Sequence, residues 1–279
     1  MPEGLKRAIR AVVPRTARNW LRSPSKTAEW LWDSARFYLG RTPTAPLLPD
    51  WRVRCHPHAY RVFVRDQIED PEQGAEFRNF ASHCADSMLL FDVGAHYGVF
   101  SLAAAHFGGK AVAVDPSPSA TRMIVLQASL NGLTDRIRIL RAAVSDTSET
   151  LALVNAGVFS NGYFQVLRGR AKGDLTEVPA LTLDQMAAEY GVPSHVKIDV
   201  EGHEGAVLRG GRHVLREHSP ILFLELHNEM VASQGGEPCG TLDELGRLGY
   251  ATFSTCGGPV GRDAILARPI VRIVAGRVK

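Results

Sequence analysis

The chain has few cysteines and no long apolar run. Its 279 residues include only four cysteines, which lie far apart at Cys55, Cys84, Cys239 and Cys256. None forms a Cys-x-x-Cys pair, so a cysteine-based zinc site is not expected. The cysteines are expected to be reduced thiols in a cytoplasmic protein. No apolar stretch reaches the roughly 18 residues of a transmembrane helix. Arg10 and Pro14 interrupt the few apolar residues near the start, so a secretory signal is not expected either.

Positive charge is concentrated at one end of a chain whose net charge is only +3. Residues 1–41 hold nine Lys and Arg against three acids. A basic segment confined to one end argues against a nucleic-acid-binding face, so no nucleic-acid partner is expected. Trp20, Trp30 and Trp32 leave two interpretations of this arm open. It is a helical cap, with a helix starting at Ser23-Pro24, or an amphipathic segment in weak contact with a membrane surface.

From residue 88 onward, short apolar runs alternate with stretches of helical period. The predicted strands are Met88–Val93, Ala111–Val114, Ile137–Val144, Val196–Val200 and Pro220–Leu226. The predicted helices are Val99–His106, Ser119–Leu130, Gly205–Glu217 and Leu242–Leu248. Such alternation predicts a parallel sheet with helices on both faces. Ala251–Ser254 and Ala264–Val274 are expected to add a C-terminal antiparallel hairpin. The predicted class is α/β, Rossmann-like, with a mostly parallel seven-stranded sheet.

The chain divides into an arm and one larger domain. Residues 1–50 are expected to form the basic helical arm and a linker with three prolines in Arg41–Pro49, and residues 51–279 the domain. Near the start of the domain, Tyr60–Val64 is predicted as a strand or hairpin arm and Glu76–His83 as a helix. There is no internal repeat or low-complexity tract.

The segment Asp92-Val93-Gly94-Ala95-His96-Tyr97-Gly98 joins the first of these strands to a helix. Glycines at such a turn let a ligand approach the backbone and expose N–H groups. A tight turn needs glycine for steric reasons as well, so the glycines alone do not identify a ligand. Asp115 ends the second strand, 17 residues beyond Gly98, where a carboxylate can accept hydrogen bonds from both ribose hydroxyls.

Asp92 distinguishes between two nucleoside cofactors. A pyrophosphate over this loop would meet its carboxylate with a repulsion of about 4 kcal/mol at about 4 Å. S-adenosylmethionine has no phosphate and carries cationic groups, so it is the predicted cofactor. An NAD-dependent oxidoreductase is disfavoured, also because one glycine of the dinucleotide fingerprint is missing. A non-catalytic protein that keeps the fold is the other alternative, against which the intact Asp92, Gly94, Gly98 and Asp115 argue.

Two stretches, Asp92–Ser101 and Val196–Glu204, resemble the FkbM family of S-adenosylmethionine-dependent methyltransferases. Shorter matches lie at Ala143–Asp146, Leu181–Asp184 and Leu222–Glu225, so the likeness covers roughly residues 85–255. The resemblance implies a class I methyltransferase fold, which the closing hairpin also indicates. It further implies methylation of a hydroxyl on a sugar, a polyketide or another metabolite.

The resemblance also implies roles for individual residues. Gly94, His96, Gly98 and Asp115 would line the cofactor site, and Asp146 would lie near the adenine. His96 departs from the family, which more often has Asn at this position. Both side chains can hydrogen-bond the methionine end of the cofactor, but an imidazole is bulkier and can titrate.

Acids and histidines gather where the fourth and fifth predicted strands end. They are Asp199, Glu201, His203, Glu204, Glu225, His227 and Glu229. Because ligands bind beyond the carboxyl ends of parallel strands, Asp199 is the first candidate for a catalytic base or positioning residue. His227 and His203 come next, although His203 also fits a helix cap or an exposed position.

Two further expectations concern a metal and the acceptor. Asp199, Glu201, Glu225 and His227 offer ligands that magnesium or a transition ion accepts. The sequence does not determine whether they converge, so the metal stays unassigned. Val154–Thr176 is either an acceptor-binding insertion or a plain surface hairpin, with candidate contacts at Asn161, Tyr163 and Arg168. The oligomeric state is not predicted.

Overall fold

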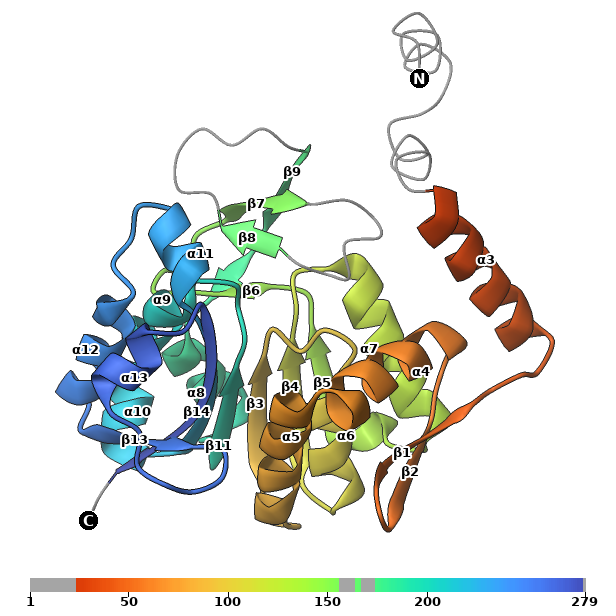
Figure 1. The fold of residues 1–279 in the computed structure, drawn as a ribbon, viewed down its shortest axis with the longest axis horizontal. Coiled ribbons are helices and arrows are strands. Elements are labelled where there is room, and N and C mark those ends of the chain that lie inside the picture. Colours follow the sequence, from red (N-terminus) through yellow and green to blue (C-terminus); the bar gives the residue numbers. More distant parts are fainter. Residues whose placement is uncertain (1–23, 156–163, 167–173, 278–279) are drawn as a thin grey trace, which may run out of the picture.

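Seven strands form one central sheet in the computed structural model, which describes residues 24–155, 164–166 and 174–277. The strands are β3 Leu89–Val93, β4 Lys110–Val114, β5 Ile137–Leu140, β11 His195–Ile198, β12 Ile221–His227, β13 Tyr250–Ser254 and β14 Ile270–Arg277. Their order is β13-β14-β12-β11-β3-β4-β5. All neighbours from β12 to β5 run parallel, whereas β14 is antiparallel to β12 and β13. The predicted mostly parallel sheet with a closing antiparallel hairpin is confirmed (Figure 1).

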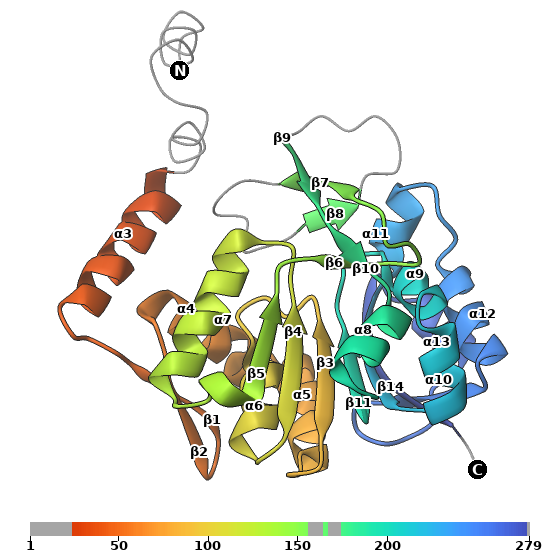
Figure 2. The same cartoon turned by 180° about the vertical axis from the view of Figure 1, so that it is seen from behind.

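Helices cover both faces of the sheet (Figures 1 and 2). They are α5 Pro71–His83, α6 Val99–His106, α7 Pro118–Leu130, α8 Leu183–Tyr190, α9 Glu204–Arg209, α10 Arg212–His218, α11 Asn228–Ser233, α12 Cys239–Arg247 and α13 Arg262–Leu266. Successive strand residues point to opposite faces. Leu90 accordingly packs in one apolar cluster with Phe80 of α5, and Phe91 in a second cluster with Met186 of α8. This three-layer arrangement leaves the carboxyl ends of the parallel strands open to ligands.

Three small sheets accompany the central one. β1 Thr44–Leu48 pairs with β2 Trp51–Arg54, and β6 Ala143–Val144 pairs with β10 Ala180–Leu181. The third sheet places β7 Leu151–Asn155 between β8 Phe164–Val166 and β9 Asp174–Val178. The candidate acceptor contacts Asn161, Tyr163 and Arg168 lie outside the described residues.

The prediction of a strand at Tyr60–Val64 was wrong. The segment is helix α4, Pro57–Val64, and it continues into a π-helical turn, η2, Arg65–Glu69. His56 caps the helix by accepting a hydrogen bond from the His58 N–H, and Pro57 occupies the first turn. Ala59, Val62 and Phe63 are buried at helical spacing, and this burial outweighs the strand propensity of the β-branched and aromatic residues.

Two other predicted elements are divided. The run Ile137–Val144 forms β5 and the separate β6, and the helix predicted over Gly205–Glu217 forms α9 and α10. At the break, a Cβ on Gly210 would lie 2.0 Å from the backbone oxygen of Ser145. Only glycine permits this approach, which brings the α9–α10 junction against the chain after β6.

The start of the described chain is helix α3, Pro24–Tyr38, as the Ser23-Pro24 pattern predicts. Its Asp33 is buried and pairs with Arg61 of α4, while Trp32 is 66% exposed.

Ala45 and Leu47 of β1 belong to the main core, so we propose that the domain begins near β1 rather than at residue 51. Contact of residues 1–41 with a membrane surface stays a prediction. Among the described residues, no helix combines the length and apolar character needed to cross a bilayer.

Candidate functional site

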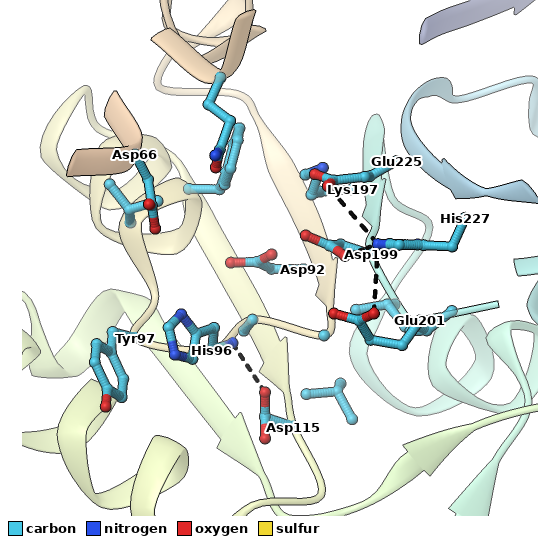
Figure 3. Close-up of a pocket in the computed structure, with 18 of the residues that line it drawn as sticks. Asp66, Asp92, His96, Tyr97, Asp115, Lys197, Asp199, Glu201, Glu225 and His227 are labelled. Atoms are coloured by element: carbon cyan, nitrogen blue, oxygen red, sulfur yellow. Dashed lines mark hydrogen bonds and ion pairs between the residues drawn. The ribbon is translucent and has the colours of Figure 1, made fainter. Parts of the chain in front are cut away.

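A cavity of about 670 Å³ lies at the carboxyl ends of the central parallel strands (Figure 3). Gly94 follows β3, Asp115 follows β4, Asp199 follows β11 and His227 ends β12, and all four line this cavity. Open parallel sheets bind ligands at this edge, and the volume is within the usual range of about 300–1,000 Å³ for small-molecule sites. These four residues, of which Gly94 and His227 are 133 positions apart, thus share one cavity.

The turn after β3 requires glycine at its first position. Gly94 has φ +81°, and a Cβ there would lie 1.8 Å from the backbone oxygen of Asp199. The turn is therefore pressed directly against the end of β11. Gly98, with φ +80°, caps the start of α6, and a Cβ there would face Ile124 of α7. Unlike Gly94, it is not among the residues that line the cavity.

The N–H groups of this turn already have acceptors within the protein. Those of Gly94 and Ala95 donate to the backbone oxygen of Val114 at 2.9 and 3.1 Å. That of His96 donates to Asp115 Oδ2 at 2.9 Å. A phosphate-binding loop needs such groups turned towards the ligand. The turn therefore fits a nucleoside without phosphate, as S-adenosylmethionine is, and disfavours a dinucleotide.

Asp115 is held as a buried hydrogen-bond acceptor at the end of β4. Its Oδ1 accepts from the Ser117 N–H at 2.8 Å, and its Oδ2 accepts from His96 (Figure 3). The side chain is nearly inaccessible, and this burial raises the pKa of Asp115 to about 7. Each carboxylate oxygen keeps a second lone pair. Asp115 can therefore still accept hydrogen bonds from two ribose hydroxyls, as the sequence predicts.

Asp92 combines a structural role with its place in the cavity. Its Oδ2 accepts hydrogen bonds from the N–H and the hydroxyl of Ser101, at 3.1 and 2.6 Å, in the first turn of α6. Burial raises the pKa of Asp92 to about 6, so the carboxylate is mostly ionised at neutral pH. A negative charge therefore lies beside the turn, where it would repel a pyrophosphate.

Four acidic side chains surround one histidine at the ends of β11 and β12. His227 Nε2 lies 3.8 Å from Asp199 Oδ1, 3.6 Å from Glu201 Oε2 and 3.7 Å from Glu225 Oε1 (Figure 3). Its Nδ1 makes a 2.8 Å hydrogen bond with Glu204 Oε1. The acids and the histidine that the sequence placed at two strand ends therefore converge.

The surroundings of His227 argue against its role as a neutral base. Burial opposes a charge on the ring, but the hydrogen bond to Glu204 and the nearby Asp199 and Glu201 outweigh it and raise the pKa of His227 to about 9. An imidazole that already carries a proton cannot accept another. Asp199 remains the candidate for proton removal, because its side chain is one-third exposed and lines the cavity.

Two other predicted site residues have protein partners. His203 lines the cavity, and its Nε2 lies 2.9 Å from Ser145 Oγ, so it connects the start of α9 to the chain after β6. Asp146, expected near the adenine, is not among the residues that line the cavity. Its carboxylate pairs with Arg209 of α9 at 2.8 Å. Val144, at the end of β6, lines the cavity in this region.

A buried ion-pair network in the wall of the cavity was not predicted. Lys197 Nζ lies 2.9 Å from Glu76 Oε1, with both side chains 3% exposed. Arg272 of β14 makes two hydrogen bonds to Glu225, at 2.7 and 3.0 Å. Glu76 belongs to α5, which precedes the stretches that resemble the FkbM family. No local sequence pattern indicates that it contacts β11.

The opposite wall of the cavity also comes from this N-terminal part of the domain. Arg65, Asp66 and Gln67 of η2 and Gln73 of α5 line it. π-Helical turns are frequent at functional sites, but their sequences carry no simple signature. The cavity therefore extends from Asp115, after β4, to a second polar region lined by η2 and β14.

Known proteins resemble this chain in family and in fold. A model of the methyltransferase FkbM domain matches residues 92–251. Methyltransferase FkbM of Methylobacillus flagellatus has 15% identity and a TM-score of 0.45, over 69% of this chain and 44% of that chain. An S-adenosylmethionine-dependent O-methyltransferase of Thermotoga maritima has 12% identity and a TM-score of 0.44, over 78% and 71%. These values are too low to equate individual site residues. No curated protein matches the sequence.

Proposed function

The chain belongs to the FkbM family of S-adenosylmethionine-dependent methyltransferases, and on that premise we propose that it methylates a hydroxyl group of a small-molecule acceptor. One observation carries the proposal. The Gly94 turn is pressed against the backbone of Asp199, so the cofactor side of the cavity directly adjoins a carboxylate that can take a hydroxyl proton. Sugars, polyketides and related metabolites offer such hydroxyls.

Each group of residues has a separate task in this proposal. Asp115 accepts the ribose hydroxyls, and Asp92 with the Gly94 turn forms the floor beneath the methionine end. When bound, S-adenosylmethionine supplies a methyl group that its sulfonium already activates for transfer. Asp199 accepts the proton of the acceptor hydroxyl as the oxygen–methyl bond forms. Because its Oδ1 faces His227, we expect Oδ2 to take the proton.

The acceptor is proposed to occupy the region between η2 and β14. This wall presents Asp66, Gln67, Gln73 and Arg272, all of which can hydrogen-bond to hydroxyl groups. Apolar contacts come from Val62 and Phe63 of α4. A polyhydroxylated metabolite with one apolar face would match this lining.

Binding and turnover experiments test the proposal. Titration calorimetry of the full chain should show binding of S-adenosylhomocysteine and none of NAD. A panel of sugar and polyketide alcohols should then be screened for release of S-adenosylhomocysteine from S-adenosylmethionine. Binding of NAD alone would overturn the cofactor assignment. Methyl transfer to amines but to no alcohol would overturn the hydroxyl assignment.

The raised pKa of Asp115 predicts pH-dependent cofactor binding. Asp92 and Asp199 disfavour its charge, as burial does, and its ionised form is the better acceptor for ribose hydroxyls. Affinity for S-adenosylhomocysteine should therefore be highest above pH 7 and fall by up to about tenfold at pH 6, where most of the carboxyl is protonated. Calorimetry between pH 6 and 8 measures this change. In Asp115→Asn, affinity should be about tenfold weaker at pH 8 and should lose most of the pH dependence. An unchanged pH profile would mean that another group titrates.

A further inference from the structure

His227 is held with one ring nitrogen aimed at several carboxylates. The side chain is 4% exposed, and Nε2 lies 3.6–3.8 Å from oxygens of Asp199, Glu201 and Glu225. Each distance exceeds that of a hydrogen bond. Ligand atoms of Asp199, Glu201 and His227 all lie within 4.8 Å of one another. Atoms that share one ion at about 2.1 Å are themselves roughly 3 to 4 Å apart, so the spacing leaves room for a cation between them.

The other ring nitrogen has the partner that metal-binding histidines usually have. Nδ1 of His227 is 2.8 Å from Glu204 Oε1, and the Glu204 side chain is 1% exposed. A carboxylate on the far nitrogen fixes the orientation of the ring and increases the basicity of the ligating nitrogen. Glu204 is thus placed to direct Nε2 towards Asp199 and Glu201.

The charges at this place are incompletely balanced within the protein. Glu225 is paired with Arg272, and Glu76 with Lys197. Among the residues that the structure describes, no Lys or Arg lies within ion-pair distance of Asp199, Glu201 or Glu204. Each of these carboxylates lies within 4 Å of His227. Three carboxylates around one histidine, at 34%, 14% and 1% side-chain exposure, favour a further positive charge.

We propose that Asp199, Glu201 and His227 bind one divalent cation of the Mg²⁺ or Mn²⁺ class at the floor of the cavity. The ion would take the place of the proton on Nε2 of His227, which is released to solvent, while Nδ1–H stays bonded to Glu204. Two carboxylates and one imidazole suit Mn²⁺ best, since it accepts oxygen and nitrogen ligands. Glu204 positions His227, and Glu225 remains on Arg272. The role of the ion rests on the proposed function. It would bind the acceptor hydroxyl, lower its pKa and hold it beside Asp199, whose other oxygen takes the proton.

Direct metal titration tests the site without relying on turnover. The full chain, freed of metal with a chelator, is titrated with Mn²⁺, and the free ion is measured by electron paramagnetic resonance. One ion per chain should bind. Glu201→Gln, which keeps the shape but removes a charged ligand, should weaken binding at least about tenfold, and Glu204→Gln by about 10- to 100-fold. Glu229→Gln is the matched control, because Glu229 is exposed and lies outside the cavity lining.

The outcomes separate the metal site from the proposed function. Failure of the wild-type chain to bind Mn²⁺ saturably, or equal binding by Glu201→Gln, would overturn the site. Thermal unfolding without Mn²⁺ establishes that each variant is folded, and Asp199→Asn replaces any variant that is not. S-adenosylhomocysteine is titrated into the same samples. If it binds while Mn²⁺ does not, only the metal site fails. If Mn²⁺ binds and alcohols are not methylated, only the role in methyl transfer fails.

Discussion

Asp199→Asn should lower kcat for methyl transfer by about 10²- to 10⁴-fold, the usual contribution of a positioned general base. The amide keeps the size of the side chain but cannot accept the hydroxyl proton. The backbone oxygen that meets the Gly94 turn is unchanged by the substitution, so the affinity for S-adenosylhomocysteine should stay near that of the wild type. Single-turnover measurements with the acceptor found by screening give the rate, and calorimetry gives the affinity.

Two comparisons show what Asp199 contributes. Glu229→Gln removes an acid two positions beyond the end of β12 and outside the cavity lining, so its kcat should equal that of the wild type. Glu201→Gln keeps Asp199 and removes a proposed metal ligand. If both Asp199→Asn and Glu201→Gln lower kcat equally, and excess Mn²⁺ restores both, the main role of Asp199 is in holding the cation. If Asp199→Asn keeps more than about a tenth of kcat, it is not the base.

Lys197→Met should reduce the free energy of unfolding by about 3–5 kcal/mol, the usual cost of breaking a buried ion pair from one side. The substitution leaves Glu76 buried, with Arg272 at 3.7 Å as its remaining cation. Burial already raises the pKa of Glu76, which shows how poorly this position accommodates an isolated charge. Urea unfolding followed by circular dichroism measures the loss.

The double variant Lys197→Met, Glu76→Leu tests the physical cause. Removal of both charges should recover most of the lost stability, because no isolated carboxylate then remains in the core. Arg272 keeps its two hydrogen bonds to Glu225 in this variant. A single variant within about 1 kcal/mol of the wild type would mean that Glu76 is accommodated by protonation or by Arg272 alone. A double variant less stable than the single one would mean that packing, not charge, dominates.

The place of the candidate site in the fold could be predicted from the sequence. Apolar runs and helical periods predicted the central strands, and parallel strands place their carboxyl ends on one edge. Gly94 and Asp115 could be located on that edge, as could the acids after β11 and β12. Each of these inferences uses residues close together in the chain or a general rule of sheet topology, so no knowledge of distant contacts was needed.

Contacts between residues far apart in the chain explain what could not be predicted from the sequence. Tyr60–Val64 has the residues of a strand, but packing of Ala59, Val62 and Phe63 in the core makes it helical. The ion pair of Asp146 with Arg209 was likewise not predicted, and it joins residues 63 positions apart in the chain. Both cases depend on a partner far along the chain, which local patterns do not specify.

The sequence by itself determined the class of fold, the glycine turn at the end of β3 and the presence of acids at two strand ends. Periodicity and strand polarity are local properties, so these could be inferred without coordinates. Only the tertiary structure decided which polar groups meet: Lys197 with Glu76, Arg272 with Glu225, and His227 with three carboxylates and Glu204. Those pairings depend on strand order and on the way α5 crosses the sheet. The case for a cation follows from the spacing of these groups in that arrangement and not from any motif.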